Sequence, residues 1–166
     1  MLEVSACPKS QEFSKFGFQV LGGEFMAKEK VIICLDWNKD LHYKFLFEAW
    51  YANPDFNFLF NDEIPSVINI SNVDRIKADL TYKIRMTTYT LIIVGANANM
   101  YHKDYKLIGY RNWQNFEIAR SRDNNNKMVV ARIDRNYDLP DELSGCGVSW
   151  AMAFRRDHII AALKNA

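Results

Sequence analysis

Short apolar runs alternate along this chain with segments whose apolar residues recur every three or four positions. The run KVIICLDW (30–37) is rich in β-branched residues and is typical of a buried strand. The segment VDRIKADLTYKIRM (73–86) carries Val73, Ile76, Leu80 and Ile84 at helical spacing. Because successive parallel strands are joined by a crossover that is usually a helix, this alternation predicts a parallel sheet with helices on both faces.

The expected elements follow one another with short connections. Strands are expected over residues 30–37, 56–62, 89–97, within 124–134, and over 147–154 as a strand or extended segment. Helices are expected over 40–53, 73–86, from within 109–121, and over 155–166. About five strands in a chain of 166 residues predict an α/β fold of flavodoxin-like type, with strand order 2-1-3-4-5.

Two expectations concern side chains. In the first helix one face carries apolar residues at helical spacing, namely Leu41, Phe45, Ala49 and Ala52. Asp40 precedes this helix and could cap it. Near the C-terminus we expect Trp150 and Phe154 to belong to the core.

Residues 1–25 differ from the rest because they show no sustained periodicity and end just after Gly22-Gly23. Met26 opens a segment that runs directly into the first expected strand. We interpret residues 1–25 as a leader or N-terminal extension, and residues 26–166 as one domain. The alternative is an arm that packs on that domain.

Composition limits the classes of partner. The formal net charge is +1, so no broad basic surface for nucleic acid is expected. No apolar run reaches the ~18 residues of a transmembrane helix, so no membrane partner is expected. The cysteines Cys7, Cys34 and Cys146 are widely spaced and form no zinc motif, which predicts no metal site and favours a reducing, cytoplasmic location.

The ligand site of such a sheet is expected beyond the carboxyl ends of its first and third strands, where the winding direction reverses. The loops that follow these strands carry Asp36, Trp37 and Asn97. The next helix carries Trp113 and Glu117, which lie four residues apart and therefore on one helix face. We expect Glu117 to face this site; the alternative is a core tryptophan beside a solvated glutamate.

Several ligand classes of this architecture are excluded because their motifs are missing. LDWNKDLH after the first strand holds no glycine, which argues against a dinucleotide-binding fingerprint and a flavodoxin phosphate loop. VGANAN after the third strand lacks the aspartate of a phosphate-accepting receiver domain. The three histidines stand in no nucleophile motif.

Four segments together resemble the TIR-like domains of bacterial anti-phage defence, in particular the ThsB type of Thoeris systems. They are VIICLDWNKDLHY, FNFLFNDE, IIVGAN and LIGYRNWQNFEIARS, and the resemblance spans residues 26–166. The W-x-x-x-E spacing of Trp113 and Glu117 matches the position of the glutamate in enzymatic TIR domains. The resemblance implies a TIR-like form of the flavodoxin-like fold, with Glu117 as the catalytic residue.

The resemblance implies an enzyme of the NAD+ glycohydrolase or ADP-ribosyl cyclase type, with NAD+ as substrate rather than as cofactor. Such enzymes break the nicotinamide–ribose bond, and some close the ADP-ribose into a cyclic signal for a separate effector. The resemblance also implies activation by a phage-derived trigger and assembly into a homo-oligomer. The alternative, from another class, is a non-enzymatic TIR scaffold that acts by homotypic assembly.

Residues around Glu117 are expected to contact the substrate, each with an alternative. Asp36 binds ribose or caps the next helix, and Trp37 stacks on a ring of NAD+ or covers the core edge. Asn97 binds phosphate or fixes a turn. Trp113 is expected to pack against the sheet more than to touch the ligand.

Overall fold

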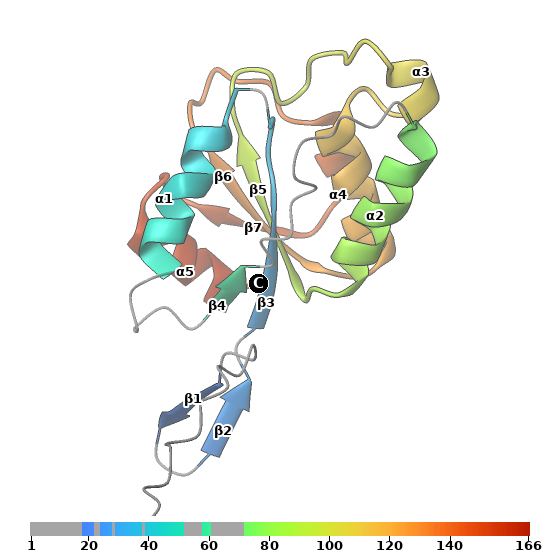
Figure 1. Ribbon diagram of the computed structural model, residues 1–166. Helices are drawn as coiled ribbons and strands as arrows, with labels where there is room; N and C mark the ends of the chain where they lie inside the picture. The colour runs from blue at the N-terminus through green and yellow to red at the C-terminus, as the bar shows by residue number, and fades with distance from the viewer. Residues whose placement is uncertain (1–17, 22–23, 28, 38, 52–57, 61–71) are drawn as a thin grey trace, which may run out of the picture.

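The computed structural model describes residues 18–21, 24–27, 29–37, 39–51, 58–60 and 72–166 (Figure 1). A five-stranded sheet contains β3 (Glu29–Cys34), β4 (Phe58–Phe60), β5 (Tyr89–Val94), β6 (Lys127–Arg132) and β7 (Val148–Ala151). The strands lie in the order β4-β3-β5-β6-β7, and every neighbouring pair is parallel. Numbered along the chain within this sheet, that order reads 2-1-3-4-5. The predicted α/β fold with a parallel sheet is confirmed.

Helices cover the sheet on both sides (Figure 1). On one side lie α1 (Leu41–Tyr51) and α5 (Arg156–Lys164), and on the other lie α2 (Val73–Arg85), α3 (Tyr105–Ile108) and α4 (Trp113–Asp123). A short 3-10 helix, η1 (Asp141–Leu143), precedes β7. Within the described segments, no helix has the length and apolar character that crossing a bilayer requires.

The side chains of β5 contribute to the hydrophobic cores on both faces of the sheet. All six residues of this central strand are buried, because it lies between β3 and β6 under helices on both faces. Leu91 and Ile93 belong to the cluster formed with α1 and α5. Ile92 and Val94 belong to a second cluster that includes Ile118 of α4. The alternation follows from the two-residue period of a strand.

Helix α2 follows its predicted pattern. Ile76, Leu80 and Ile84 are its buried residues, as the helical spacing indicated. The side chain of Asn72 accepts hydrogen bonds from the backbone N–H groups of Asp74 and Arg75, at 3.0 and 3.2 Å, and so caps the helix.

The predicted apolar face of α1 is wrong. Phe45 is 57% exposed and Leu41 is exposed, whereas Phe47 is fully buried. Tyr43 and Trp50 pack against the same cluster as Phe47. Apolar residues occur around most of this helix, so their spacing is compatible with more than one buried face. The face that carries Tyr43, Phe47 and Trp50 is the one that packs on the sheet, because large aromatic side chains bury more apolar area than the alanines of the predicted face. Of the other predicted residues, Ala49 is exposed and Ala52 lies outside the described residues.

Trp150 is also not a core residue, since it is 48% exposed. It lies on β7, the edge strand, next to Ala151, which is buried in the cluster with α5. Adjacent strand residues point to opposite faces, so Trp150 faces away from that cluster. Phe154 is partly buried against it, as expected.

A hairpin that the sequence analysis did not anticipate precedes the domain. β1 (Phe18–Leu21) and β2 (Glu24–Ala27) pair antiparallel and form a sheet of their own. Figure 1 shows the hairpin extending away from the five-stranded sheet. It crosses the expected boundary at residue 25, and residues 1–17 lie outside the described part. The division into 1–25 and 26–166 stays a prediction.

The central position of β5 makes Ile93 a test of the sheet. Ile93→Ala should lower the free energy of unfolding by ~2–5 kcal/mol, because Ile93 is fully buried between strand neighbours and helices. Urea denaturation measures this change. Leu107→Ala, at a side chain that is 64% exposed, is the control and should cost less than about 0.5 kcal/mol. Equal losses in the two variants would contradict the central placement of β5.

Candidate functional site

The start of α4 is fastened to the loop that follows β5. The side-chain oxygen of Asn112 accepts a hydrogen bond from the backbone N–H of Asn115 at 2.9 Å and caps the helix. The side-chain amide of Asn112 donates to the carbonyl oxygens of Ala98 at 3.0 Å and Met100 at 2.9 Å. These bonds set where the first turn of α4 meets the carboxyl edge of the sheet.

Gln114, in that first turn, bridges the two strands at which the sheet changes its winding direction. Its side-chain amide donates to the carbonyl oxygens of Ile93 at 2.7 Å and Cys34 at 3.3 Å. Cys34 ends β3, and Ile93 is the residue before the end of β5. Gln114 therefore sits at the switch point, where ligands of such sheets bind. The sequence analysis missed it, although its spacing of three residues from Glu117 places both on one helix face.

Glu117 lies one turn beyond Gln114 and is only 3% exposed. Burial raises the pKa of its carboxyl to about 7. Hydrogen bonds from the Cys34 thiol and the Trp37 indole, and the charge of Lys83, act in the opposite direction. Oε2 of Glu117 is buried without a hydrogen-bond partner among the described residues. The group is therefore a partly protonated acid near neutral pH, with one oxygen unpaired.

Cys34 is buried, and it lies at the candidate site. Burial, followed by the charge of Glu117 and the hydrogen bond to it, raises the pKa of the Cys34 thiol well above its ordinary value. The thiol therefore stays protonated at neutral pH and is a hydrogen-bond donor, not a nucleophile. Its Sγ donates to the carbonyl oxygen of Gln114 at 3.6 Å.

A second buried carboxyl group, that of Asp40, lies at the same edge of the sheet. A Cβ atom at Gly95, the residue that follows β5, would overlap the Asp40 carboxylate, so only glycine allows this approach. Burial raises the pKa of Asp40, and the nearby charge of Asp36 adds to the shift. Oδ2 of Asp40 has no hydrogen-bond partner in the described part of the chain. From the sequence, the position of Asp40 before α1 indicates only a helix cap.

The structure gathers Asp36 and Trp37 at this edge, since both follow β3 directly and are half-buried. The carbonyl oxygen of Asp36 accepts from the backbone N–H groups of Lys39 and Asp40, at 3.2 and 2.8 Å, in the turn that leads into α1. Trp37 packs against the cluster under α1 and also donates to Glu117.

Asn97 lies in the loop after β5, where its carbonyl oxygen accepts from the backbone N–H of Met100 at 2.9 Å. It fixes a turn in this way. Across the described segments its side chain makes no hydrogen bond to Asp36, Trp37 or Glu117.

Trp113 does not pack against the sheet, contrary to the prediction. It joins a cluster between α2, α3 and α4, where its ring centroid lies 5.9 Å from that of Phe116 and 6.4 Å from that of His102. Successive helix residues are rotated by about 100°. Gln114 takes the sheet-facing position of the first turn, and this rotation turns Trp113 towards α2 and α3.

Among the residues that the structure describes, no group of three or more His, Cys, Asp or Glu side chains could hold a metal ion. The polar atoms at the carboxyl edge are instead carboxyl and amide groups whose hydrogen-bonding capacity is partly unused. Such groups can bind hydroxyl groups or stabilise a developing positive charge.

Residues 32–138 match the family model described as the Thoeris protein ThsB, TIR-like domain. The matched range covers more than half of the chain and includes Gln114, Glu117, Asp40 and Trp37. No curated protein matches the chain.

The raised pKa of Glu117 predicts how the stability of the protein depends on pH. The pKa of Glu117 is about 7 in the folded protein against 4.5 for the free group, so the folded state binds the proton more tightly. Stability should therefore fall as the pH rises from about 4.5 through 7, by ~3 kcal/mol in total. Glu117→Gln cannot ionise and should lack this decline, so the variant gains on wild type between pH 5 and pH 8 in urea denaturation.

The matched control is Glu48→Gln, because the Glu48 side chain is 42% exposed. Glu48→Gln should not reproduce the gain in stability over wild type that Glu117→Gln shows between pH 5 and pH 8. Parallel stability profiles for wild type and Glu117→Gln would show that Glu117 does not titrate in this range.

Proposed function

Since the chain belongs to the family of the Thoeris protein ThsB TIR-like domain, we propose that it cleaves the nicotinamide–ribose bond of NAD+ and closes the ADP-ribose into a cyclic signal. The observation that supports this proposal is the placement of Glu117. This buried carboxyl belongs to α4 and lies at the carboxyl edge of the sheet, and its Oε2 has no hydrogen-bond partner among the described residues. The Thoeris system of anti-phage defence is the context that the family suggests.

The proposed chemistry needs one carboxylate. As the bond between the ribose carbon and nicotinamide breaks, its electron pair goes to the nicotinamide nitrogen, and positive charge develops on the ribose carbon. The ionised carboxylate of Glu117 would stabilise that charge, most strongly in a site shielded from water. Nicotinamide leaves as a neutral molecule, so no second acid has to donate a proton. Attack by a group of the same ADP-ribose gives a cyclic product, and attack by water gives a linear one.

The neighbours of Glu117 have proposed roles that follow from their positions. Trp37 holds the carboxylate by its indole N–H, and its half-buried ring is placed to stack on a ring of NAD+. In this proposal Asp36 binds ribose hydroxyls and Asn97 approaches the phosphates. Trp113 would act on this site indirectly, by holding α4 against α2 and α3. NAD+ is the substrate in this proposal, and no further cofactor is invoked.

The burial of Glu117 supports the proposal that the enzyme has to be activated before it can bind its substrate. The side chain is 3% exposed, so covering groups have to move before a substrate can reach it. A phage-derived trigger or assembly into a homo-oligomer would supply that movement, and the product would reach a separate effector as a soluble nucleotide. The protein would act in the cytoplasm, where NAD+ is available.

Glu117→Gln tests the proposal, because it keeps the size of the side chain and removes its charge. In the triggered state, the variant should release nicotinamide from NAD+ ~10²–10³ times more slowly than wild type. The wild-type rate should rise as the pH increases through about 7, because the ionised form is the active one and the pKa lies there. Nicotinamide release measured by chromatography over pH 5.5–8.5 gives both results.

Glu48→Gln serves again as the control and should keep the wild-type rate. If folded Glu117→Gln releases nicotinamide as fast as wild type, the catalytic role is wrong. A wild-type protein that never releases nicotinamide, even with trigger and effector present, would favour the non-enzymatic scaffold.

A further inference from the structure

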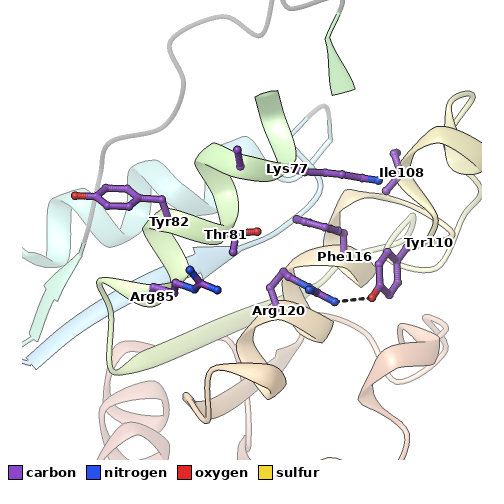
Figure 2. A pocket seen from close by; sticks show the side chains of 9 residues that line it. Lys77, Thr81, Tyr82, Arg85, Ile108, Tyr110, Phe116 and Arg120 are labelled. Atoms are coloured by element: carbon purple, nitrogen blue, oxygen red, sulfur yellow. Dashed lines mark hydrogen bonds between the residues drawn. The ribbon is translucent and has the colours of Figure 1, made fainter. Parts of the chain in front are cut away.

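A cavity of about 550 Å³ lies between α2 and α4, on the side of α4 that faces away from the sheet (Figure 2). Side chains from α2 form one wall, and residues from α4 and the segment before it form the other. Glu117 is not among its lining residues, since it faces the sheet from the opposite side of α4. The cavity is therefore separate from the candidate site. Its volume falls in the range of small-molecule pockets.

The α2 wall supplies two positive charges that pair with no acidic side chain of the described segments. Lys77 donates to the carbonyl oxygen of Leu107 at 2.7 Å, and this neutral partner leaves the ammonium charge uncompensated. Arg85 is exposed and makes no hydrogen bond or ion pair with any other residue that the structure describes. Figure 2 shows its guanidinium directed across the cavity towards Arg120. The Arg120 guanidinium points the other way, to the Tyr110 hydroxyl, so Arg85 is the cation of this cavity that has no partner among the described residues.

The α4 wall combines a third cation with aromatic rings. Arg120 donates to the Tyr110 hydroxyl at 2.9 Å and pairs with Asp123 at 2.9 Å, while its Nε is buried with no partner in the described segments. The Phe116 ring lies 5.6 Å from both the Arg120 guanidinium carbon and the centroid of the Tyr110 ring. Among the residues that the structure describes, no acidic side chain lines the cavity. Even when Asp123 is counted as the partner of Arg120, the described lining carries an excess of positive charge.

We propose that this cavity binds a small phosphorylated molecule with a flat ring, of the mononucleotide class. Phosphate oxygens would bridge Arg85 and Arg120, whose planar guanidinium groups suit two-point binding of phosphate. The ring would lie against Tyr110, the half-buried aromatic side chain of this wall, since Phe116 and Ile108 are themselves buried. A phosphate alone would leave the Tyr110 ring uncovered, and an uncharged ring would leave Arg85 without a counter-charge, so the cavity favours a ligand that has both parts.

Isothermal titration calorimetry of the full chain tests the proposal, with AMP as the probe and adenosine and inorganic phosphate as partial probes. AMP should bind at least tenfold more tightly than either partial probe. Arg85→Ala should weaken AMP binding at least tenfold, because it removes a charge-assisted pair without touching the core. Arg75→Ala is the matched control, since it is an exposed arginine of the same helix outside the cavity. It should change the AMP affinity less than twofold.

Glu117→Gln separates this proposal from the proposed catalysis, and it should bind AMP as wild type does. Loss of AMP binding in Glu117→Gln would place the nucleotide at the candidate site and overturn the proposal. Equal weakening by Arg75→Ala and Arg85→Ala would show general electrostatic attraction only. Phosphate binding as tight as that of AMP, or no AMP binding in the millimolar range, would also overturn it. Far-UV circular dichroism confirms that each variant is folded.

Discussion

The side-chain amide of Gln114 donates to the carbonyl oxygens of Ile93 and Cys34, at the edge where β5 and β3 lead the chain in different directions. These two bonds tie the first turn of α4 to the switch point of the sheet. Because Glu117 follows one turn later on the same helix face, its carboxyl is carried to the Cys34 thiol and the Trp37 indole. Further polar contacts of α4 reach one strand each, as that of Ser121 with Thr90 of β5 does, whereas the Gln114 amide reaches both.

The inner face of α4 is unusually polar for a helix that packs on a sheet. Gln114, Glu117 and Ser121 are all buried there, and Ser121 is bonded to Thr90 by their hydroxyl groups at 2.8 Å. Oε1 of Gln114 and Oε2 of Glu117 have no partner among the described residues. Leaving buried polar atoms unpaired opposes folding, and a helix that served packing alone would carry apolar residues here. This local loss of stability supports the view that the face is built for a ligand.

Predictions from sequence succeeded where the determining contacts are local. The buried strands and the register of α2 follow from apolar periodicity, and Glu117 lies at the predicted edge because the order of elements places its helix there. Gln114 and Asp40 were missed because their partners come from distant segments; Gln114 and Cys34 are 80 positions apart. The W-x-x-x-E spacing places Trp113 and Glu117 on neighbouring turns of α4, but it does not determine which residue of the first turn faces the sheet. In the structure that residue is Gln114, and Trp113, one position earlier, points towards α2 and α3. The roles of the site residues stay proposals.

The ionisation of Glu117 itself is the most direct measurement of this account. The carboxyl ¹³C chemical shift of Glu117, assigned by comparison with Glu117→Gln, can be followed by NMR from pH 4 to pH 9. We expect a midpoint near pH 7, because burial outweighs the hydrogen bonds from Cys34 and Trp37. In Trp37→Phe the midpoint should move higher, since one bond to the ionised form is lost. A wild-type midpoint at or below the ordinary 4.5 would contradict the buried carboxyl on which the proposed site depends.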